Sequence, residues 1–314
     1  MADKKTISII IPVYNEELNI LPLYERLEKV IKGLDDRYDF EILFTDNHSE
    51  DSSFEILRKL AGQDSRVKVL RFSKNFGYQH SIYTGYVSCK GDAAMQLDCD
   101  LQDPPELIPK FIKKWEDGHE VVYGIRRSRK EGFVITGLRK IFYRLLDRLS
   151  EESLPPDAGD FRLVDRCILN ALKKIHDMSP YLRGTIASLG FRQTGIPYDR
   201  DERKYGKGKF RFGQLIQLAL DGILNHSVFP LRIASLVGLV VSILTAFGIL
   251  VYIAGRLFFK EYFPTGVATI IIFLLFSITL NSIFLGIIGE YLGRIYKQVK
   301  KRPLVFIEET VNFE

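Results

Sequence analysis

Cysteine is scarce in this chain of 314 residues, and its first residues lack the features of a signal peptide. Its three cysteines, Cys89, Cys99 and Cys167, have neither the spacing of a metal site nor that of a redox motif. The first residues contain no apolar stretch followed by a small-residue cleavage site, and they lead directly into a strand-like run. We therefore expect reduced thiols, in an N-terminal part that stays in the cytoplasm.

Charge is absent from two long apolar runs, one between Arg232 and Arg256 and the other between Glu261 and Glu290. Roughly 20 apolar residues in a helix span the bilayer core of about 30 Å. We expect two transmembrane helices, and a pair of buried helices in a soluble protein is the alternative.

Basic residues flank the two runs unevenly. The loop between the runs holds only Arg256 and Lys260. The outer flanks hold Lys204, Lys207, Lys209, Arg211 and Arg232 before the first run, and Arg294, Lys297, Lys300, Lys301 and Arg302 after the second. The positive-inside rule then predicts an integral membrane protein with both termini in the cytoplasm, as in a bacterial-type inner membrane. The net charge of +5 fits contact with anionic membrane lipid, and no nucleic-acid-binding module is visible.

Strand-like and helix-like segments alternate along the first 125 residues. The expected strands are 7–13, 40–45, 67–72, 93–97 and 120–123, and the expected helices are 17–32, 52–61, 79–88 and 105–117. This alternation predicts an α/β fold whose parallel sheet carries helices on both faces. Ligands of such sheets bind at the carboxyl ends of the strands.

The segments between this region and the first apolar run have weaker patterns. Residues 134–150 are typical of a basic amphipathic helix, and 154–159 of a turn-rich linker. Apolar residues recur at helical spacing over 210–226, just before the first apolar run. We expect an interfacial helix there that lies in the membrane plane, and a core-facing helix is the alternative.

Carboxylates follow the strand expected at 93–97. In an extended chain Asp98 and Asp100 project from one face, where they can hold Mg²⁺ or Mn²⁺ while water and phosphate oxygens complete the coordination. Tyr14 and Asp46 close the first two strands. Asp46 could accept a hydrogen bond from the imide of a uracil and Tyr14 could pack on the base, or the two could be a helix-entry turn and an N-cap.

Several motifs together resemble those of the large inverting family 2 glycosyltransferases, which have the GT-A fold. They are Ser8–Glu16, Asp46–Asp51, Lys74–Gly77 and Asp98–Gln102. Further segments, with the two apolar runs, are similar to polyprenyl-phosphate glycosyltransferases, such as GtrB-like bactoprenol glucosyltransferases and dolichol-phosphate mannose synthases. These segments are Val122–Arg126, Asp157–Leu163 and Arg203–Phe210.

The resemblance, which covers nearly the whole chain, implies a donor pocket and a metal site. The implied nucleotide-sugar-binding residues are Pro12, Tyr14, Glu16, Asp46, Lys74, Asp98 and Gln102. Asp98 and Asp100 would hold the metal and, through it, the donor diphosphate.

The acceptor implied by the resemblance is a phosphate, which is already anionic, so a strong general base is less necessary than for a hydroxyl acceptor. The reaction mainly needs cations that position the phosphates. The candidate acceptor-phosphate residues are Arg126, Arg139, Arg162, Arg203 and Lys209. Asp157 and Asp160 would act in catalysis with Arg126, either orienting the phosphate or accepting a proton, and a turn carboxylate is the alternative for each.

We therefore expect inverting transfer of a hexose, with UDP-glucose favoured as donor, to a polyprenyl phosphate of the undecaprenyl type. The alternatives are another donor such as GDP-mannose or a UDP-amino sugar, a processive polysaccharide synthase, or a non-catalytic membrane scaffold. A processive synthase usually carries a Gln-x-x-Arg-Trp motif, which is absent because Trp115 is the only tryptophan.

The expected organisation is a catalytic GT-A domain over 1–209, a juxtamembrane amphipathic helix over 210–228, two transmembrane helices over 229–293 and a cytoplasmic tail over 294–314. Residues 303–307 of the tail have a strand pattern. Because an exposed strand needs a partner, we expect it to pair with a neighbouring subunit in a homo-oligomer.

Overall fold

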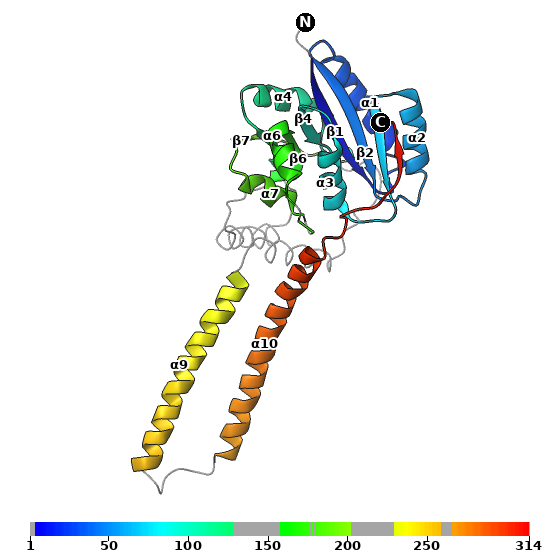
Figure 1. The fold of residues 1–314 in the computed structure, drawn as a ribbon. Helices are drawn as coiled ribbons and strands as arrows, with labels where there is room; N and C mark the ends of the chain where they lie inside the picture. Colours follow the sequence, from blue (N-terminus) through cyan, green and yellow to red (C-terminus); the bar gives the residue numbers. More distant parts are fainter. Residues whose placement is uncertain are drawn as a thin grey trace. The chain divides into compact units, whose positions relative to one another are not determined.

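The computed structural model describes residues 4–127, 158–201 without 176 and 179, 229–258 and 266–313. The chain divides into two compact units (Figure 1). One is formed by Met1–Ile216 together with Arg302–Glu314, and the other by Gln217–Lys301. The helices expected at 134–150 and 210–226, and most of the linker expected at 154–159, lie outside the described residues.

The first unit is built on one sheet of eight strands in the order β7-β5-β6-β4-β1-β2-β3-β8. Strands β3, β2, β1 and β4 are mutually parallel, which confirms the parallel sheet expected from the sequence. Strand β6 runs antiparallel to both β4 and β5. The strands are β1 Lys5–Val13, β2 Tyr38–Asp46, β3 Val67–Phe72, β4 Ala93–Gln96, β5 Val121–Arg126, β6 Ala158–Asp165, β7 Gln193–Tyr198 and β8 Ile307–Val311.

Helices cover both faces of the sheet because alternate residues of its central strand point to opposite sides. In β1, Ile9 belongs to the core cluster that includes Leu23 of α1, whereas Ile10 belongs to the cluster that includes Ile82 of α3. The helices of the first unit are α1 Ile20–Lys32, α2 Ser53–Gln63, α3 Tyr78–Ser88, the 3₁₀ turn η1 Pro105–Leu107, α4 Ile108–Glu116, α6 Arg166–Leu172 and α7 Leu182–Ser188.

Helix α3 approaches the sheet so closely that only glycine fits at one position. A Cβ atom added to Gly85 would lie 2.3 Å from Cγ2 of Ile10. This contact fixes the depth at which the first turn of α3 sits against the carboxyl ends of β1 and β4. The polar side chains at that edge depend on this placement.

The strand near the C-terminus pairs differently from what we expected. Strand β8 begins at Ile307 rather than ending there, and it runs antiparallel to β3 of its own chain. Its neighbour Asn312 donates from Nδ2 to the backbone oxygens of Ala61 and Val67, at 2.7 and 2.8 Å. The segment thus has a strand partner within its own chain, because the edge of β3 supplies the backbone groups, and the homo-oligomer stays a prediction.

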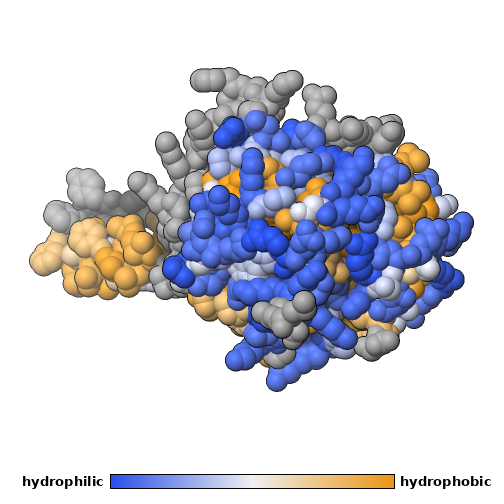
Figure 2. Space-filling view, turned by 90° about the horizontal axis from the view of Figure 1, so that it is seen from above, coloured by the Kyte–Doolittle hydropathy of each residue, from blue (hydrophilic) through white to orange (hydrophobic). Residues whose placement is uncertain are grey.

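The second unit consists of helices α9 (Phe229–Phe258) and α10 (Val267–Val299). In the described part of the chain, one segment, Phe273–Val299, is long and apolar enough to cross a membrane, and Ile233–Gly248 is a shorter apolar helix. Large side chains such as Phe247 and Phe273 are exposed on them. Figure 2 shows the described residues of this unit as mainly hydrophobic, whereas the visible face of the sheet unit is mainly hydrophilic. The first of the two expected spans, between Arg232 and Arg256, therefore stays a prediction.

Candidate active site

The polar residues expected to act together lie at the carboxyl edge of the parallel strands. Val13 at the end of β1 pairs in register with Asp46 at the end of β2, and β1 also pairs with β4, which the Asp98 loop follows. On the other side of β4, Gln96 stands opposite Arg162 of β6. The topology thus brings the expected donor residues and one expected acceptor residue to the same edge.

The Asp46 carboxylate is fully buried and only partly satisfied. Its Oδ1 accepts from the backbone N–H of Ser49 at 3.1 Å, and its Oδ2 has no hydrogen-bond partner, although Arg71 Nη1 lies 3.7 Å from it. Burial raises the pKa of Asp46. A buried acceptor without a partner costs free energy, so this oxygen is suited to the N–H of a ligand.

The loop that carries Lys74 is fastened beside this carboxylate by Asn47. Asn47 accepts from the backbone N–H of Phe76 at 2.8 Å and donates from Nδ2 to Oδ1 of Asn75, also at 2.8 Å. The Lys74 ammonium lies 5.1 Å from the centre of the Phe76 ring. These two bonds hold the loop that follows β3 against Asn47, the residue after β2, where the exposed side chain of Lys74 can reach a ligand.

Asp98 and Asp100 lie in a turn, not in the extended strand that we expected, because β4 ends at Gln96. Leu101 has φ of 61°, a left-handed conformation that is uncommon for a residue with a branched side chain. Asp100 accepts from the backbone N–H of Gln102 at 3.2 Å, which stabilises this turn. The two carboxylates still converge, and the turn rather than strand alternation brings them together.

Asp98 is held from the sheet side by neutral donors. Tyr78, at the start of α3, donates to its Oδ1 at 2.6 Å, and Gln96 Nε2 donates to the same oxygen at 2.8 Å. Burial, together with the negative charges of Asp103 and Asp100, raises the pKa of Asp98 from 3.8 to about 7. The carboxylates are therefore close enough to repel one another, and a cation would relieve that repulsion.

A divalent cation fits this donor set. Among the described residues no group of three or more His, Cys, Asp and Glu side chains is arranged to hold a metal. Mg²⁺ in particular is commonly bound through one or two carboxylates plus water and substrate phosphates. Asp98 and Asp100 suit a site of that kind, in which the ligand supplies part of the coordination.

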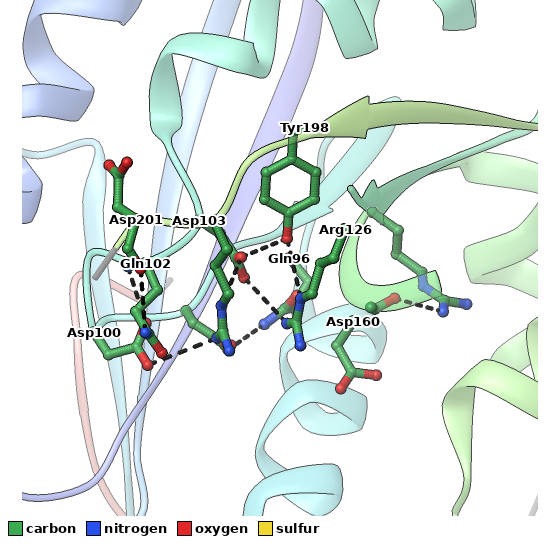
Figure 3. Close-up of polar contacts among 12 residues, drawn as sticks. Gln96, Asp100, Gln102, Asp103, Arg126, Asp160, Tyr198 and Asp201 are labelled. Carbon is green, nitrogen blue, oxygen red and sulfur yellow. Dashed lines mark hydrogen bonds and ion pairs between the residues drawn. The ribbon is translucent and has the colours of Figure 1, made fainter. Parts of the chain in front are cut away.

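A cluster that the sequence did not predict continues the site towards β5 and β7 (Figure 3). The Asp103 side chain is fully buried and accepts from the hydroxyl of Tyr198 at 2.5 Å. Arg126 donates from Nε to the Tyr198 oxygen at 3.4 Å and lies 3.9 Å from Asp103 Oδ2. Arg200 lies 3.3 Å from Asp103 Oδ1 through its Nε. Asp103 was visible in the Asp-rich motif, but nothing in the sequence pairs it with residues 198–200.

Asp160 belongs to a buried ion pair. Arg183 binds it in bidentate fashion, with Nε to Oδ1 at 2.8 Å and Nη2 to Oδ2 at 2.6 Å. Burial by itself would raise the pKa of Asp160, but the charge and hydrogen bonds of Arg183 outweigh it and lower that pKa. The carboxylate therefore stays ionised. Sequence reasoning missed Arg183, which lies outside every motif that we identified.

Three arginines of the described part of the chain lie around Asp160. Arg162 is buried and donates from Nη2 to the backbone oxygen of Gly159 at 3.0 Å. A Cβ atom on Gly159 would lie 3.3 Å from Nη2 of Arg126, so the glycine leaves room for that guanidinium. Arg126, Arg162 and Arg183 thus surround one carboxylate. Guanidinium groups bind phosphate oxygens well, so these three arginines suit an anionic ligand.

The remaining predicted residues are placed as follows. Pro12, Tyr14 and Glu16 lie at or just after the end of β1, where the backbone of Glu16 donates to Ser53 Oγ at 2.9 Å. Gln102 donates from Nε2 to the backbone oxygen of Asp201 at 3.2 Å. Arg139, Asp157, Arg203 and Lys209 lie outside the described residues.

Comparisons with known proteins agree on the class of enzyme. The model of "Glycosyl transferase family 2" matches residues 8–173. The uncharacterized glycosyltransferase YkcC of Bacillus subtilis (strain 168) is 40% identical over 308 residues, which cover 98% of this chain and 94% of YkcC. The SfII prophage-derived bactoprenol glucosyl transferase of Shigella flexneri is 33% identical over 306 residues, 97% of this chain and 98% of that protein.

A solved structure shows the same fold. It is the mannosyltransferase PcManGT from Pyrobaculum calidifontis in complex with GDP-Man and Mn²⁺, with a TM-score of 0.50 and 14% identity over 96% of this chain and 87% of that one. The mostly parallel α/β sheet is thus of the GT-A type. Because the family model matches more than half of the chain, and because its relatives align with almost its full length, the chain belongs to glycosyl transferase family 2 and is a glycosyltransferase.

Proposed function

We propose that this glycosyltransferase moves a hexose, with inversion, from a nucleotide sugar to a polyprenyl phosphate at the cytoplasmic face of a membrane. The main observation behind the proposal is that a candidate donor site and a candidate acceptor site lie on neighbouring strands at one edge of the sheet. Asp98 and Asp100 follow β4, and the cationic cluster around Asp160 lies on β6, the next strand, where Arg162 stands opposite Gln96. A donor diphosphate and an acceptor phosphate bound there would be neighbours.

The buried Asp46 supports a base with an N–H donor, because its Oδ2 lacks a hydrogen-bond partner. Both the imide of uracil and the N1–H of guanine could donate to it. We favour UDP-glucose, since several relatives that align over nearly the whole chain are bactoprenol glucosyl transferases. PcManGT was solved with GDP-Man and Mn²⁺, so GDP-mannose stays the second candidate.

Asp98 and Asp100 would hold Mg²⁺ or Mn²⁺, which when bound supplies positive charge to the departing diphosphate. The chain's own cations position the reactants. Arg126 contacts Asp103 on the donor side and lies beside Gly159 on the acceptor side, so it is placed to contact phosphate oxygens of both substrates. Asp160 is kept ionised by Arg183 and would orient these guanidinium groups rather than take up a proton.

The membrane part of the proposal rests on α10 and on the sheet. Strand β8 follows α10 in the chain and pairs with β3, so the chain returns to the unit that it left before α9. If the segment 217–301 crosses a bilayer, it must therefore cross an even number of times. A single crossing by α10 would place β8 and β3 on opposite sides. This favours two spans with both termini on the same side, which the positive-inside rule assigns to the cytoplasm, and it makes β8 part of the catalytic domain.

The test is transfer of label from radiolabelled UDP-glucose to undecaprenyl phosphate by the full chain in detergent, with Mg²⁺ or with EDTA. The variants are Asp98→Ala and, as control, Asp117→Ala, an exposed carboxylate on the far end of α4. We expect metal-dependent lipid labelling that is lost in Asp98→Ala and kept in Asp117→Ala. Labelling from GDP-mannose alone would overturn the donor, and transfer only to acceptors without a lipid phosphate would overturn the acceptor.

A further inference from the structure

The guanidinium group of Arg200 sits beside Asp98 and Asp100, the carboxylates that would hold the metal, and beside the buried Asp103. Its Nη2 lies 3.7 Å from Oδ2 of Asp98 and 3.8 Å from Oδ2 of Asp100, and its Nε lies 3.3 Å from Oδ1 of Asp103. The side chain of Asp103 is fully buried, and those of Asp98 and Asp100 are 19% and 16% exposed. A cation of the chain itself therefore offsets part of the negative charge of this cluster.

Arg200 is held there by charge more than by directed hydrogen bonds. Its distances to Asp98 and Asp100 exceed those of hydrogen bonds, and its buried Nε has no hydrogen-bond partner. Arg183 offers an internal comparison, because it makes two short bonds of 2.8 and 2.6 Å to a single carboxylate. A guanidinium fixed for structural reasons has that geometry, and Arg200 does not.

The loop that carries the carboxylates is tied to the end of β7 without the Arg200 side chain. The backbone N–H of Asp201 donates to the oxygen of Gln102 at 3.0 Å, and Gln102 Nε2 donates to the oxygen of Asp201 at 3.2 Å. Tyr198 adds its bond to Asp103. The Arg200 side chain is thus not needed to hold this loop against the end of β7, so that role does not account for its charge.

A metal ion and Arg200 need the same oxygens. With only two carboxylates available, a divalent cation gains enough ligands when the donor diphosphate supplies more oxygens. The diphosphate also offers the guanidinium a new anionic partner, since arginine binds phosphate oxygens in bidentate fashion. The arrival of the donor would therefore pull Arg200 away from the carboxylates at the step in which the metal enters.

We infer that Arg200 is a positioning residue that occupies the metal site of the donor-free enzyme and yields it only when the nucleotide sugar binds, so that metal and donor bind together. This inference rests on the proposed function, because it takes Asp98 and Asp100 as the metal ligands. The role that it adds for Arg200 is control of metal binding in the donor-free enzyme.

The experiment measures Mn²⁺ affinity, not turnover. The full chain in detergent is titrated with Mn²⁺, and free Mn²⁺ is followed by electron paramagnetic resonance, without nucleotide and with saturating UDP. The variants are Arg200→Gln and the charge-conserving Arg200→Lys. Arg192→Gln is the control, because Arg192 is an exposed arginine that precedes the same strand, β7. Asp98→Ala reports whether the ion binds at the proposed carboxylates at all.

Without nucleotide, Arg200→Gln should bind Mn²⁺ about 10-fold more tightly than the parent, a typical size for coupling between two ligands. Saturating UDP should remove most of this difference in Mn²⁺ affinity. Arg200→Lys should stay near the parent, and so should Arg192→Gln. Equal or weaker Mn²⁺ binding by Arg200→Gln without nucleotide would overturn the inference and leave the metal site intact. Unchanged Mn²⁺ binding by Asp98→Ala would instead overturn the metal site of the proposed function.

Discussion

Replacing Asp98 by asparagine should stabilise the metal-free protein while removing its activity. The pKa of this carboxyl is raised from 3.8 to about 7 by burial and by the neighbouring carboxylates. Each pKa unit corresponds to about 1.36 kcal/mol, so keeping Asp98 ionised at pH 8 costs about 4 kcal/mol of folding free energy. The amide has nearly the same shape and carries no charge. The bond from Tyr78 weakens by about 1 kcal/mol when its acceptor becomes neutral, which leaves a gain of about 2–3 kcal/mol.

The gain depends on pH in a defined direction. Because the folded-state pKa of Asp98 lies above its unfolded value, the protein binds more protons when folded. The stability that comes from the protonated carboxyl is fully present below pH 3.8 and is lost as the pH rises through about 7. The advantage of Asp98→Asn should therefore be largest above pH 7, and it should shrink by more than half at pH 5.

The assay is thermal unfolding of the full chain in detergent with EDTA and without donor, followed by intrinsic fluorescence at pH 8 and pH 5. A gain of 2–3 kcal/mol corresponds to a rise in Tm of about 4–12 °C for a unit of this size. Asp117→Asn, at an exposed carboxylate, should leave the Tm unchanged. The reasoning is refuted if Asp98→Asn melts at or below the parent at pH 8, or if its advantage is the same at both pH values.

Three further changes test the packing of the sheet unit. Arg183→Ala leaves Asp160 buried without its partner, so urea unfolding should show a loss of about 3–5 kcal/mol, and adding Asp160→Asn should recover part of it. Gly91→Ala places a Cβ 2.8 Å from the backbone nitrogen of Ser8 and should cost about 1–3 kcal/mol in the same assay, whereas Gly62→Ala, with nothing within 4 Å, should be neutral or slightly stabilising. Truncation after Arg302 removes β8 and exposes the edge of β3, so light scattering should show association and the Tm should fall. A monodisperse truncated chain with an unchanged Tm would contradict that last expectation.

The central sheet was predictable because its signals are local. Strand β1 is a continuous apolar run that ends in polar residues, and the helix that follows, α1, buries apolar residues at helical spacing. Strand β6 was not predictable as a strand. It inserts between β4 and β5 and runs antiparallel to both, and no local pattern fixes such a non-local pairing. The same holds for β8, whose strand pattern was visible but whose partner β3 lies more than 200 residues earlier.

Some residues of the site could likewise be predicted from the sequence, and others could not. Asp46, Asp98 and Asp100 were identified because each follows a predicted strand, and the carboxyl ends of parallel strands share one edge. Arg183 and Arg200 were missed because their roles depend on partners that are distant in sequence. The geometry of the Asp98 turn was also predicted incorrectly, since β4 ends at Gln96, four residues before Asp100, the last residue of an extended Asp-x-Asp.

The position of β8 also determines when the sheet can be completed during synthesis. The ribosome completes β3 and the other parallel strands first, then α9 and α10, and only afterwards β8. While α9 and α10 are being synthesised, no strand covers the outer edge of β3. The backbone N–H and C=O groups of that edge are therefore unpaired during this interval. Closure of the sheet by β8 then joins the two ends of the helical hairpin to one folded body. A chain that stalls within α10 never reaches that closure, so its nascent domain keeps an open edge that chaperones or proteases can detect.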